Sequence, residues 1–169
     1  MSRRLILQRH AKSSWKDATL TDHARPLNKR GRRAAPAVAG YLQRTGWCPQ
    51  LVLCSDAART RETWARSAPE WAVEPPVSYL PEFYGAGAST IAAAISVVPT
   101  AVETVLLVGH NPGWEQAASR WTRTPVVLKT ADAALLEAPP HFAHSPWSVV
   151  DLDQMRLVAV VRARAVTEE

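Results

Sequence analysis

Short apolar runs alternate along the chain with segments in which apolar residues recur at helical spacing. Six apolar runs predict strands, at residues 5–7, 51–54, 77–80, 105–108, 131–136 and 155–164. Helical spacing predicts four helices, from Asn28 to Gly46, from Ser55 to about residue 67, over 88–98 and over 114–121. Strands that alternate with helices build a mostly parallel sheet covered by helices. We therefore expect a three-layer α/β/α sandwich.

Polar residues mark the predicted starts of two helices. Asn28 and Ser55 are residue types whose side chains accept hydrogen bonds from the first turn of a helix, so both are predicted N-caps. Gly46 stands where the first helix is predicted to end.

The length of the chain fits one domain and leaves little room for two. A chain of 169 residues buries roughly 70% of its unfolded surface, which is enough for one stable core. We find no internal repeat, low-complexity tract or linker. We expect a single domain over residues 1–169.

Basic residues give the chain a net charge of +5, with the densest run at residues 29–33 (Lys-Arg-Gly-Arg-Arg). This charge favours anionic partners. It suits nucleic acid and phosphate-bearing substrates equally, because the same long-range field attracts both. Charge alone leaves both classes of partner open.

Neither the cysteines nor the apolar runs indicate an exported or membrane-bound protein. Cys48 and Cys54 cannot build a disulfide framework, and neither matches a Cys-x-x-Cys or metal-ligand spacing. The apolar run that begins at Leu5 spans three residues, too few for a signal peptide, and no run has the length of a membrane span. We expect a cytoplasmic protein with no membrane partner.

Three polar motifs lie where a predicted strand ends. Arg9-His10 follows the first strand, residues 55–59 (Ser-Asp-Ala-Ala-Arg) follow the second, and Gly109-His110 follows the strand at 105–108. In open α/β sheets, ligands bind outside the carboxyl ends of the strands. We therefore expect the three motifs to meet in one site.

The residue types in these motifs suit phosphoryl transfer. The His10 imidazole can attack phosphorus and hold the phosphoryl group covalently, which divides one difficult hydrolysis into two easier steps. Arg9 offers paired donors to phosphate oxygens, and Arg59 adds a second guanidinium near a positive helix N-terminus. His110 can stabilise charge on the transferred oxygens.

The sequence does not fit two other classes of enzyme that act on phosphate groups. A cysteine-dependent phosphatase needs five residues between its Cys and its Arg, but Thr60 stands at that position after Cys54. The chain also lacks the Gly-x-x-x-x-Gly-Lys phosphate loop of nucleotide hydrolases.

These segments resemble the histidine phosphatase superfamily, and most closely its short branch, the phosphohistidine phosphatases of the SixA type. Four motifs carry the resemblance in order: Arg-His-Ala-Lys-Ser at residues 9–13, an Arg-Pro-Leu loop within 22–31, Ser55 with Arg59 and Thr63, and Gly-His-Asn-Pro at 109–112. The order and spacing hold from Leu5 to about residue 121.

The resemblance implies a phosphoglycerate mutase-like fold without a large cap insertion. It implies that His10 is the nucleophile and that Arg9, Arg59 and His110 bind the phosphoryl group. We expect the reaction to need no metal and no cofactor.

Three further residues match the family more loosely. Ser13 matches a hydroxyl position that contacts phosphate in larger members. Arg25, in the Arg-Pro-Leu loop, either lines the same pocket or braces the loop. Glu82 is the nearest candidate for a proton donor, because the chain has little room for the insertion that carries this acid in larger members; an exposed loop position is the alternative.

The resemblance suggests phosphohistidine in a protein as the substrate, with a small phosphomonoester metabolite as the alternative. From another class, a non-catalytic basic module that holds nucleic acid or a phosphorylated partner would also explain the charge. Such a module has no need of a nucleophile like His10. We expect a phosphatase whose partner is a phosphorylated protein or a small phosphorylated substrate and not nucleic acid; the sequence leaves its oligomeric state open.

Overall fold

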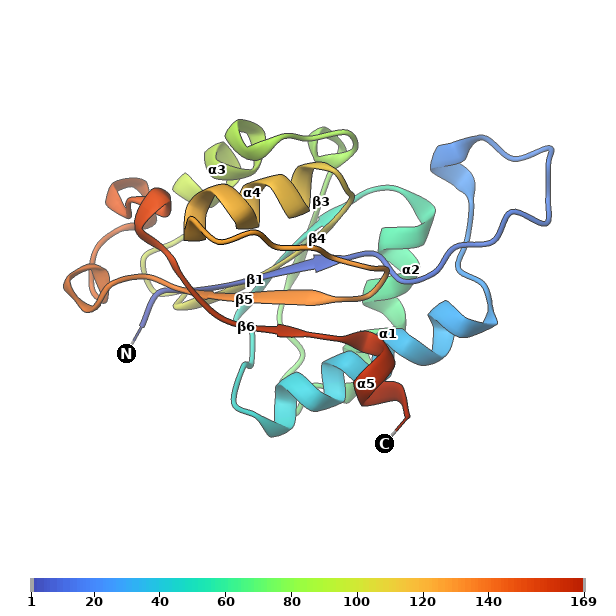
Figure 1. Cartoon of the computed structure of the whole chain (residues 1–169), viewed down its shortest axis with the longest axis horizontal. Coiled ribbons are helices and arrows are strands. Elements are labelled where there is room, and N and C mark those ends of the chain that lie inside the picture. Colours follow the sequence, from blue (N-terminus) through green and yellow to red (C-terminus); the bar gives the residue numbers. More distant parts are fainter. Residues whose placement is uncertain (1, 169) are drawn as a thin grey trace.

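The computed structural model describes residues 2–168 and is built around one six-stranded sheet (Figure 1). The strands are β1 (Arg4–Arg9), β2 (Leu51–Ser55), β3 (Val77–Leu80), β4 (Thr104–Gly109), β5 (Ala133–Glu137) and β6 (Arg156–Val161). They lie in the order β3-β2-β4-β1-β5-β6. The first four are parallel, whereas β5 and β6 run antiparallel to their neighbours. The predicted mostly parallel sheet is confirmed.

Helices cover both faces of the sheet, as predicted (Figure 1). The α-helices are α1 (Lys29–Arg44), α2 (Ala58–Ser67), α3 (Ala88–Ser96), α4 (Gly113–Thr122) and α5 (Ala163–Thr167). Short 3-10 helices span Asp22–Ala24, Ala68–Glu70, Pro81–Phe83, Pro140–Phe142, Trp147–Val149 and Leu152–Gln154. Within residues 2–168 no large insertion roofs the sheet. No helix of this part is long and apolar enough to cross a membrane.

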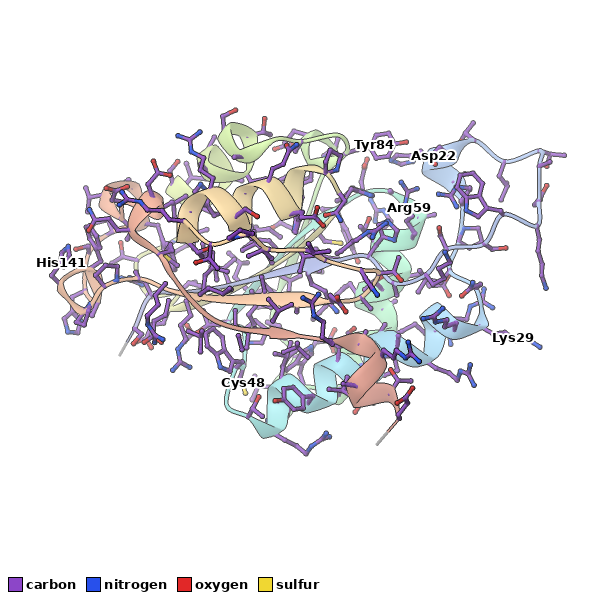
Figure 2. All side chains as sticks on the ribbon, in the orientation of Figure 1. Asp22, Lys29, Cys48, Arg59, Tyr84 and His141 are labelled. Carbon is purple, nitrogen blue, oxygen red and sulfur yellow. The ribbon has the colours of Figure 1, made fainter. Side chains whose placement is uncertain are left out.

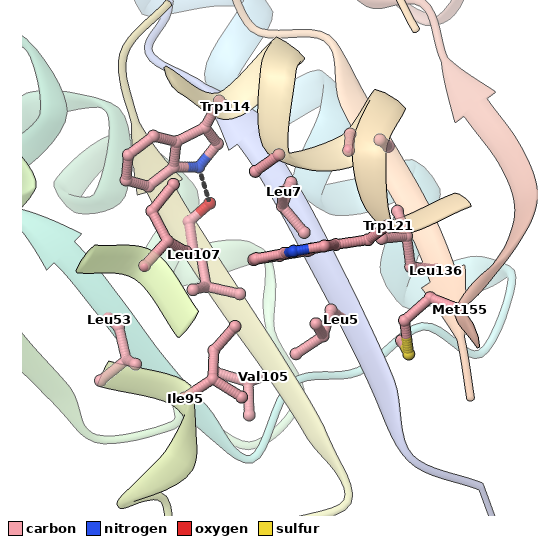
Figure 3. Packing of buried hydrophobic residues seen from close by; sticks show 14 of the residues in the cluster. Leu5, Leu7, Leu53, Ile95, Val105, Leu107, Trp114, Trp121, Leu136 and Met155 are labelled. Carbon is pink, nitrogen blue, oxygen red and sulfur yellow. Dashed lines mark hydrogen bonds between the residues drawn. The ribbon is translucent and has the colours of Figure 1, made fainter. Parts of the chain in front are cut away.

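Side chains of each strand alternate between two hydrophobic cores. Leu5 and Leu7 of β1 pack in the core beneath α3 and α4, whereas Ile6 packs in the core beneath α1 and α2. Figure 3 shows the first core, where the Trp114 indole N–H donates to the Leu107 carbonyl at 3.1 Å. This packing fixes β1 and β4, the two central strands that end next to histidines.

The two predicted N-caps have different outcomes. Asn28 caps α1 as predicted, and its side chain accepts a backbone N–H of the first turn. The prediction for Ser55 is wrong, because Ser55 is the last residue of β2 and α2 begins at Ala58. Ser55 stays in the strand because it pairs with Leu80 of β3, and its hydroxyl contacts His110.

The last predicted strand is too long. Strand β6 ends at Val161, and α5 begins at Ala163. The buried carboxylate of Asp132 turns the chain here, because it accepts the Ala163 N–H at 2.9 Å and pairs with Arg162 at 2.7 Å. This long-range contact has no signal in the local apolar pattern.

Candidate active site

Three strand ends bring His10, Arg59 and His110 together. His10 follows β1, His110 follows β4, and Arg59 lies in the first turn of α2, just after β2. Because these strands are adjacent and parallel, their carboxyl ends lie at one edge of the sheet. The two histidine rings are 5.4 Å apart between centroids, and Arg59 Nε donates to His10 Nε2 at 3.3 Å. The predicted convergence is confirmed, and all three side chains are buried.

Two neighbours decide which nitrogen of His10 carries the proton. The Ala11 carbonyl, 2.7 Å from Nδ1, only accepts hydrogen bonds, so Nδ1 must donate. The Arg59 Nε–H only donates, so Nε2 must present its lone pair. His10 is therefore held as the neutral tautomer with an electron pair on Nε2, the form that a nucleophile needs.

Burial keeps His10 uncharged. The pKa of His10 is lowered to about 3, chiefly because the charged imidazolium would lose its hydration in the interior. The hydrogen bond to Ala11 opposes this shift, whereas the positive charges of Arg59 and Arg9 add to it. At neutral pH the ring is thus ready to attack.

His110 is held by the hydroxyl of Ser55. The Ser55 Oγ lies 2.7 Å from His110 Nε2 and accepts the Ala57 N–H at 3.4 Å. A hydroxyl can donate as well as accept, and when the Ser55 hydroxyl donates to Nε2, the His110 proton lies on Nδ1. Burial lowers the pKa of His110 to about 4, so this ring is also neutral at pH 7.

Arg9 brings a second guanidinium from the end of β1. Its Nη1 donates to the Leu128 carbonyl at 3.1 Å. Burial lowers the pKa of Arg9, and the carboxylates of Glu115 and Asp132 oppose that shift. An arginine starts from so high a pKa that it stays charged.

Two buried donors at this edge of the sheet lack a partner in the described part of the chain. They are Arg9 Nε and His110 Nδ1. An unsatisfied buried donor costs about 1–3 kcal/mol, and the oxygens of a phosphoryl group would supply the missing acceptors. Together with Arg59, these donors suit the binding of an oxyanion next to His10 Nε2.

The loop that carries His10 is fixed to both neighbouring helices. Thr63 Oγ1 of α2 accepts the Ala11 N–H at 3.0 Å. Gly31 of α1 packs so closely that a Cβ there would lie 2.2 Å from the Lys12 carbonyl oxygen. The nucleophile loop therefore cannot shift without disturbing α1 or α2.

Arg25 and Ser13 contact each other. Arg25 Nη1 donates to Ser13 Oγ at 2.8 Å, and the guanidinium lies 3.4 Å over the ring of Trp15. Arg25 also pairs with Asp22 at 3.1 Å. These contacts favour the bracing role for Arg25 within the loop that joins β1 to α1. A phosphate contact from Ser13 stays a prediction.

Asp22 and Tyr84 belong to the site and were missed by sequence reasoning. The Asp22 carboxylate accepts Arg59 Nη2 at 3.1 Å and the Tyr84 hydroxyl, and Figure 2 shows the three side chains together at one end of the molecule. The pKa of Asp22 is lowered to about 2, first by the Tyr84 hydrogen bond and also by Arg59. The Tyr84 ring meets His110 edge to face at 5.4 Å. Asp22 lies in the matched Arg-Pro-Leu segment, which was the available signal.

Glu82 lies in the 3-10 helix Pro81–Phe83 and is exposed. Its carboxylate makes no hydrogen bond or ion pair with any side chain among residues 2–168. Phe83, its neighbour, is the buried anchor of this turn and packs against Trp114 at 5.1 Å. The proton-donor role of Glu82 stays a prediction without support from this geometry.

Potential metal ligands do not cluster in the part of the chain described by the structure. No three His, Cys, Asp or Glu side chains among residues 2–168 lie close enough to hold a metal ion. Of the five histidines in the sequence, His10 and His110 are the two at the carboxyl edge of the central strands.

Comparisons with known proteins agree with this geometry. A model of the histidine phosphatase superfamily (branch 1) matches residues 5–83. An uncharacterised chloroplastic protein of Arabidopsis thaliana is 46% identical over 147 residues, which cover 82% of this chain and 67% of the plant protein.

Solved structures give the same relationship over nearly the whole chain. A candidate phosphohistidine phosphatase SixA from Nakamurella multipartitia is 30% identical, with a TM-score of 0.78 and coverage of 96% of both chains. Another from Agrobacterium tumefaciens is 27% identical, with a TM-score of 0.78 and coverage of 96% of this chain and 99% of that one. The chain belongs to the histidine phosphatase superfamily, in its short SixA-like form, and is a phosphatase.

Proposed function

We propose that the protein is a metal-independent phosphatase that works through a phosphohistidine intermediate on His10 and removes phosphate from phosphohistidine in a protein. One observation carries the proposal. His10 Nδ1 donates to the Ala11 carbonyl at 2.7 Å, and Nε2 keeps its lone pair beside Arg59. A buried neutral histidine whose Nε2 electron pair lies among positive charges suits attack on phosphorus better than it suits a structural role.

In the first step, His10 Nε2 attacks the phosphorus in line with the leaving group. The Nε2–P bond forms while the bond between phosphorus and the substrate nitrogen breaks. The electron pair of the broken bond leaves with the substrate imidazole, which is neutral when its other nitrogen carries a proton. Arg9, Arg59 and the His110 N–H hold the phosphoryl oxygens.

In the second step, water attacks the phosphorus of phospho-His10. The Nε2–P bond breaks, its electron pair returns to Nε2, and phosphate leaves with the oxygen of the water. The protons of the water end on the phosphate or in solvent. His10 is the leaving group of this step. Because the Ala11 carbonyl holds the proton on Nδ1 throughout, the imidazole is released from phosphorus in its neutral form.

Neither acidic residue near the site is suited to donate a proton, which favours a leaving group that needs none from the enzyme. Asp22, which contacts Arg59, is kept ionised by a pKa of about 2. Glu82 is exposed, and no hydrogen bond or ion pair with residues 2–168 directs its carboxylate toward His10. An alkyl phosphate would have to leave as an alkoxide unless an acid protonated it. Phosphohistidine is therefore the better supported substrate.

A quench experiment tests the proposal. Wild-type protein is mixed with a phosphohistidine peptide or with glycerol phosphate, an alkyl phosphomonoester, in the presence of a metal chelator, and the protein is analysed for covalent phosphate. We expect faster turnover of the peptide and an adduct that is labile in acid and stable in alkali. His10→Ala should lose both the adduct and the turnover.

His141→Ala is the matched control. His141 lies at the opposite end of the molecule from Arg59 (Figure 2), so its loss should leave the adduct and the rate unchanged. Full activity in His10→Ala, or loss of activity with the chelator, would contradict the mechanism. Faster turnover of glycerol phosphate than of the peptide would instead favour a small phosphomonoester as the substrate.

A further inference from the structure

A basic cleft lies beside the active site, between the N-terminus of α1, the segment at residues 127–132 and α5. Its volume is about 850 Å³. Six cationic side chains line it: Lys12, Arg30, Arg33, Lys129, Arg162 and Arg164. Arg30 and Arg33 come from the basic run of the sequence, which the active site does not use. They are three residues apart, so they share one face of α1.

Most of the positive charge in this cleft is uncompensated. Asp132 pairs with Arg162 at 2.7 Å, and Glu168 pairs with Arg164 at 3.5 Å. The other four cations, Lys12, Arg30, Arg33 and Lys129, are exposed and form no ion pair with any carboxylate of residues 2–168. An anionic ligand would therefore meet four charges that hold no internal partner.

The walls of the cleft are tied to the nucleophile loop. Lys12 is two residues beyond His10, and its carbonyl accepts the Asn28 N–H at 3.0 Å. On the opposite wall, the Ala131 N–H donates to the His10 carbonyl at 3.0 Å. Lys129 follows Leu128, whose carbonyl holds Arg9. Residues next to the nucleophile and next to the carbonyl that holds Arg9 therefore both line the cleft. Figure 2 shows Lys29, at the start of α1, at the same end of the molecule as Arg59.

We propose that this cleft binds an acidic segment, rich in Asp and Glu, of the phosphoprotein whose phosphohistidine occupies the active site. The inference rests on the proposed function for the identity of the protein partner. Charge complementarity carries it, because four cations without an ion-pair partner among residues 2–168 line a groove whose wall includes Lys12, two residues after the nucleophile. No aromatic side chain of residues 2–168 lines the groove, so this part of the chain offers no stacking platform there for the bases of a single-stranded nucleic acid.

The test compares a cleft variant with a control of equal charge. Arg30→Gln/Arg33→Gln removes two charges from the cleft. Arg44→Gln/Arg123→Gln removes two exposed charges elsewhere; Arg44 is about 20 Å further along α1, and Arg123 follows α4 on the other face of the sheet. Equal net charge keeps the long-range attraction of anions matched between the two proteins.

The first readout is kcat/KM on two phosphohistidine peptides, one with an Asp/Glu-rich flank and one with Asn/Gln in its place. Wild type and the Arg44/Arg123 variant should prefer the acidic peptide by about tenfold at low salt, and the Arg30/Arg33 variant by about twofold or less. Free phosphohistidine should be hydrolysed at the same rate by all three. Equal preference in the two variants would overturn the proposal.

The second readout does not depend on catalysis. A fluorescent, unphosphorylated acidic peptide should bind wild type and lose about fivefold in affinity in the Arg30/Arg33 variant only. If no phosphohistidine compound is hydrolysed but this binding pattern holds, the proposed function fails and the acidic-ligand site stands. If a single-stranded oligonucleotide binds through Arg30 and Arg33 more tightly than the peptide, the cleft is a nucleic-acid site and the inference is wrong.

Discussion

The loops after β1 and after β4 each place a neutral, buried histidine at the same edge of the sheet, but they leave opposite nitrogens available. After β1, the Ala11 carbonyl takes the Nδ1 proton of His10 and leaves the Nε2 lone pair. After β4, the Ser55 hydroxyl occupies Nε2 of His110 and leaves the Nδ1 proton. One loop therefore presents an electron pair, and the other presents a hydrogen-bond donor.

The two loops also differ in how firmly they fix the proton. A backbone carbonyl can only accept, so the His10 tautomer has no alternative while the loop keeps its shape. A hydroxyl can rotate and either donate or accept, so the His110 tautomer depends on one side-chain torsion. The nucleophile is thus held by the backbone, and the second histidine by an adjustable side chain.

Replacing each histidine by alanine should give very unequal losses. His10→Ala removes the atom that forms the covalent intermediate, so we expect kcat to fall by about 10,000-fold or more. His110→Ala removes one oxyanion donor and should cost about 100- to 1000-fold. Steady-state rates on a phosphohistidine peptide, with acid-labile adduct measured in parallel, check this. Equal losses, or no adduct in His110→Ala, would break the comparison.

Acid should destabilise the folded protein through both rings. Each folded-state pKa lies below the ordinary value of 6.5, at about 3 for His10 and about 4 for His110. Below pH 6.5 the unfolded chain therefore binds protons that the folded chain does not, and stability falls by roughly 1.4 kcal/mol per pH unit and ring. The loss ends near pH 4 for His110 and near pH 3 for His10.

Urea unfolding at pH 7 and pH 5 measures this effect. We expect each ring to contribute about 2 kcal/mol of the loss between these pH values, so His10→Gln and His110→Gln should each lose less stability than wild type on acidification. His141→Gln, an exposed position, should follow wild type. A variant of either buried ring with an unchanged pH dependence would show that the ring is not kept neutral by burial.

Ser55→Ala should affect His110, which the Ser55 hydroxyl holds, and leave His10 unchanged. Without the hydroxyl, His110 Nε2 loses its donor and the proton is free to move from Nδ1, so we expect kcat to fall by about tenfold. The tautomer of His110, read from nitrogen chemical shifts, should change while that of His10 stays. Ser67→Ala is the control, since the Ser67 hydroxyl is buried but donates to the Thr63 carbonyl, away from both rings. A similar loss of kcat in both variants would indicate a general loss of structure.

Much of this site could be predicted because it depends on chain direction. Parallel neighbouring strands end at one edge of the sheet, so the residues that follow them lie close together. The sequence therefore predicted that His10, Arg59 and His110 lie at the same edge. The role of Ser55 could not be predicted in this way. A serine after a strand and before a helix reads as an N-cap, and only the neighbouring β4 supplies the histidine that its hydroxyl binds.

The contact between Asp22 and Tyr84 could not be predicted from the sequence, for a different reason. They are 62 positions apart in the chain and meet only because the loop before α1 and the turn after β3 reach the same edge of the sheet. No local period or motif encodes such a contact. The same holds for Asp132, which precedes the neighbouring strand β5 and binds the chain where β6 ends.

Tyr84→Phe should have the smallest effect of these variants. It tests whether the contact between Tyr84 and Asp22 positions Arg59 alone or His110 as well. The Tyr84 hydroxyl is the largest cause of the low pKa of Asp22, so its removal should raise that pKa and loosen Asp22 on Arg59. A lost hydrogen bond of about 1 kcal/mol corresponds to about a fivefold rise in KM, with kcat nearly unchanged.

Tyr79→Phe is the matched control, since Tyr79 lies under Arg61, outside the site. KM and kcat on a phosphohistidine peptide, with a titration of the Asp22 carboxyl shift, check the prediction. Because the Tyr84 ring also meets His110 edge to face, a fall in kcat like that of Ser55→Ala would mean that the hydroxyl orients His110 as well as Asp22. No change in KM would mean that Arg59 keeps its position without the hydrogen bond between Tyr84 and Asp22. The loop after β1, which is fixed by backbone hydrogen bonds, would then set the geometry of the nucleophile by itself.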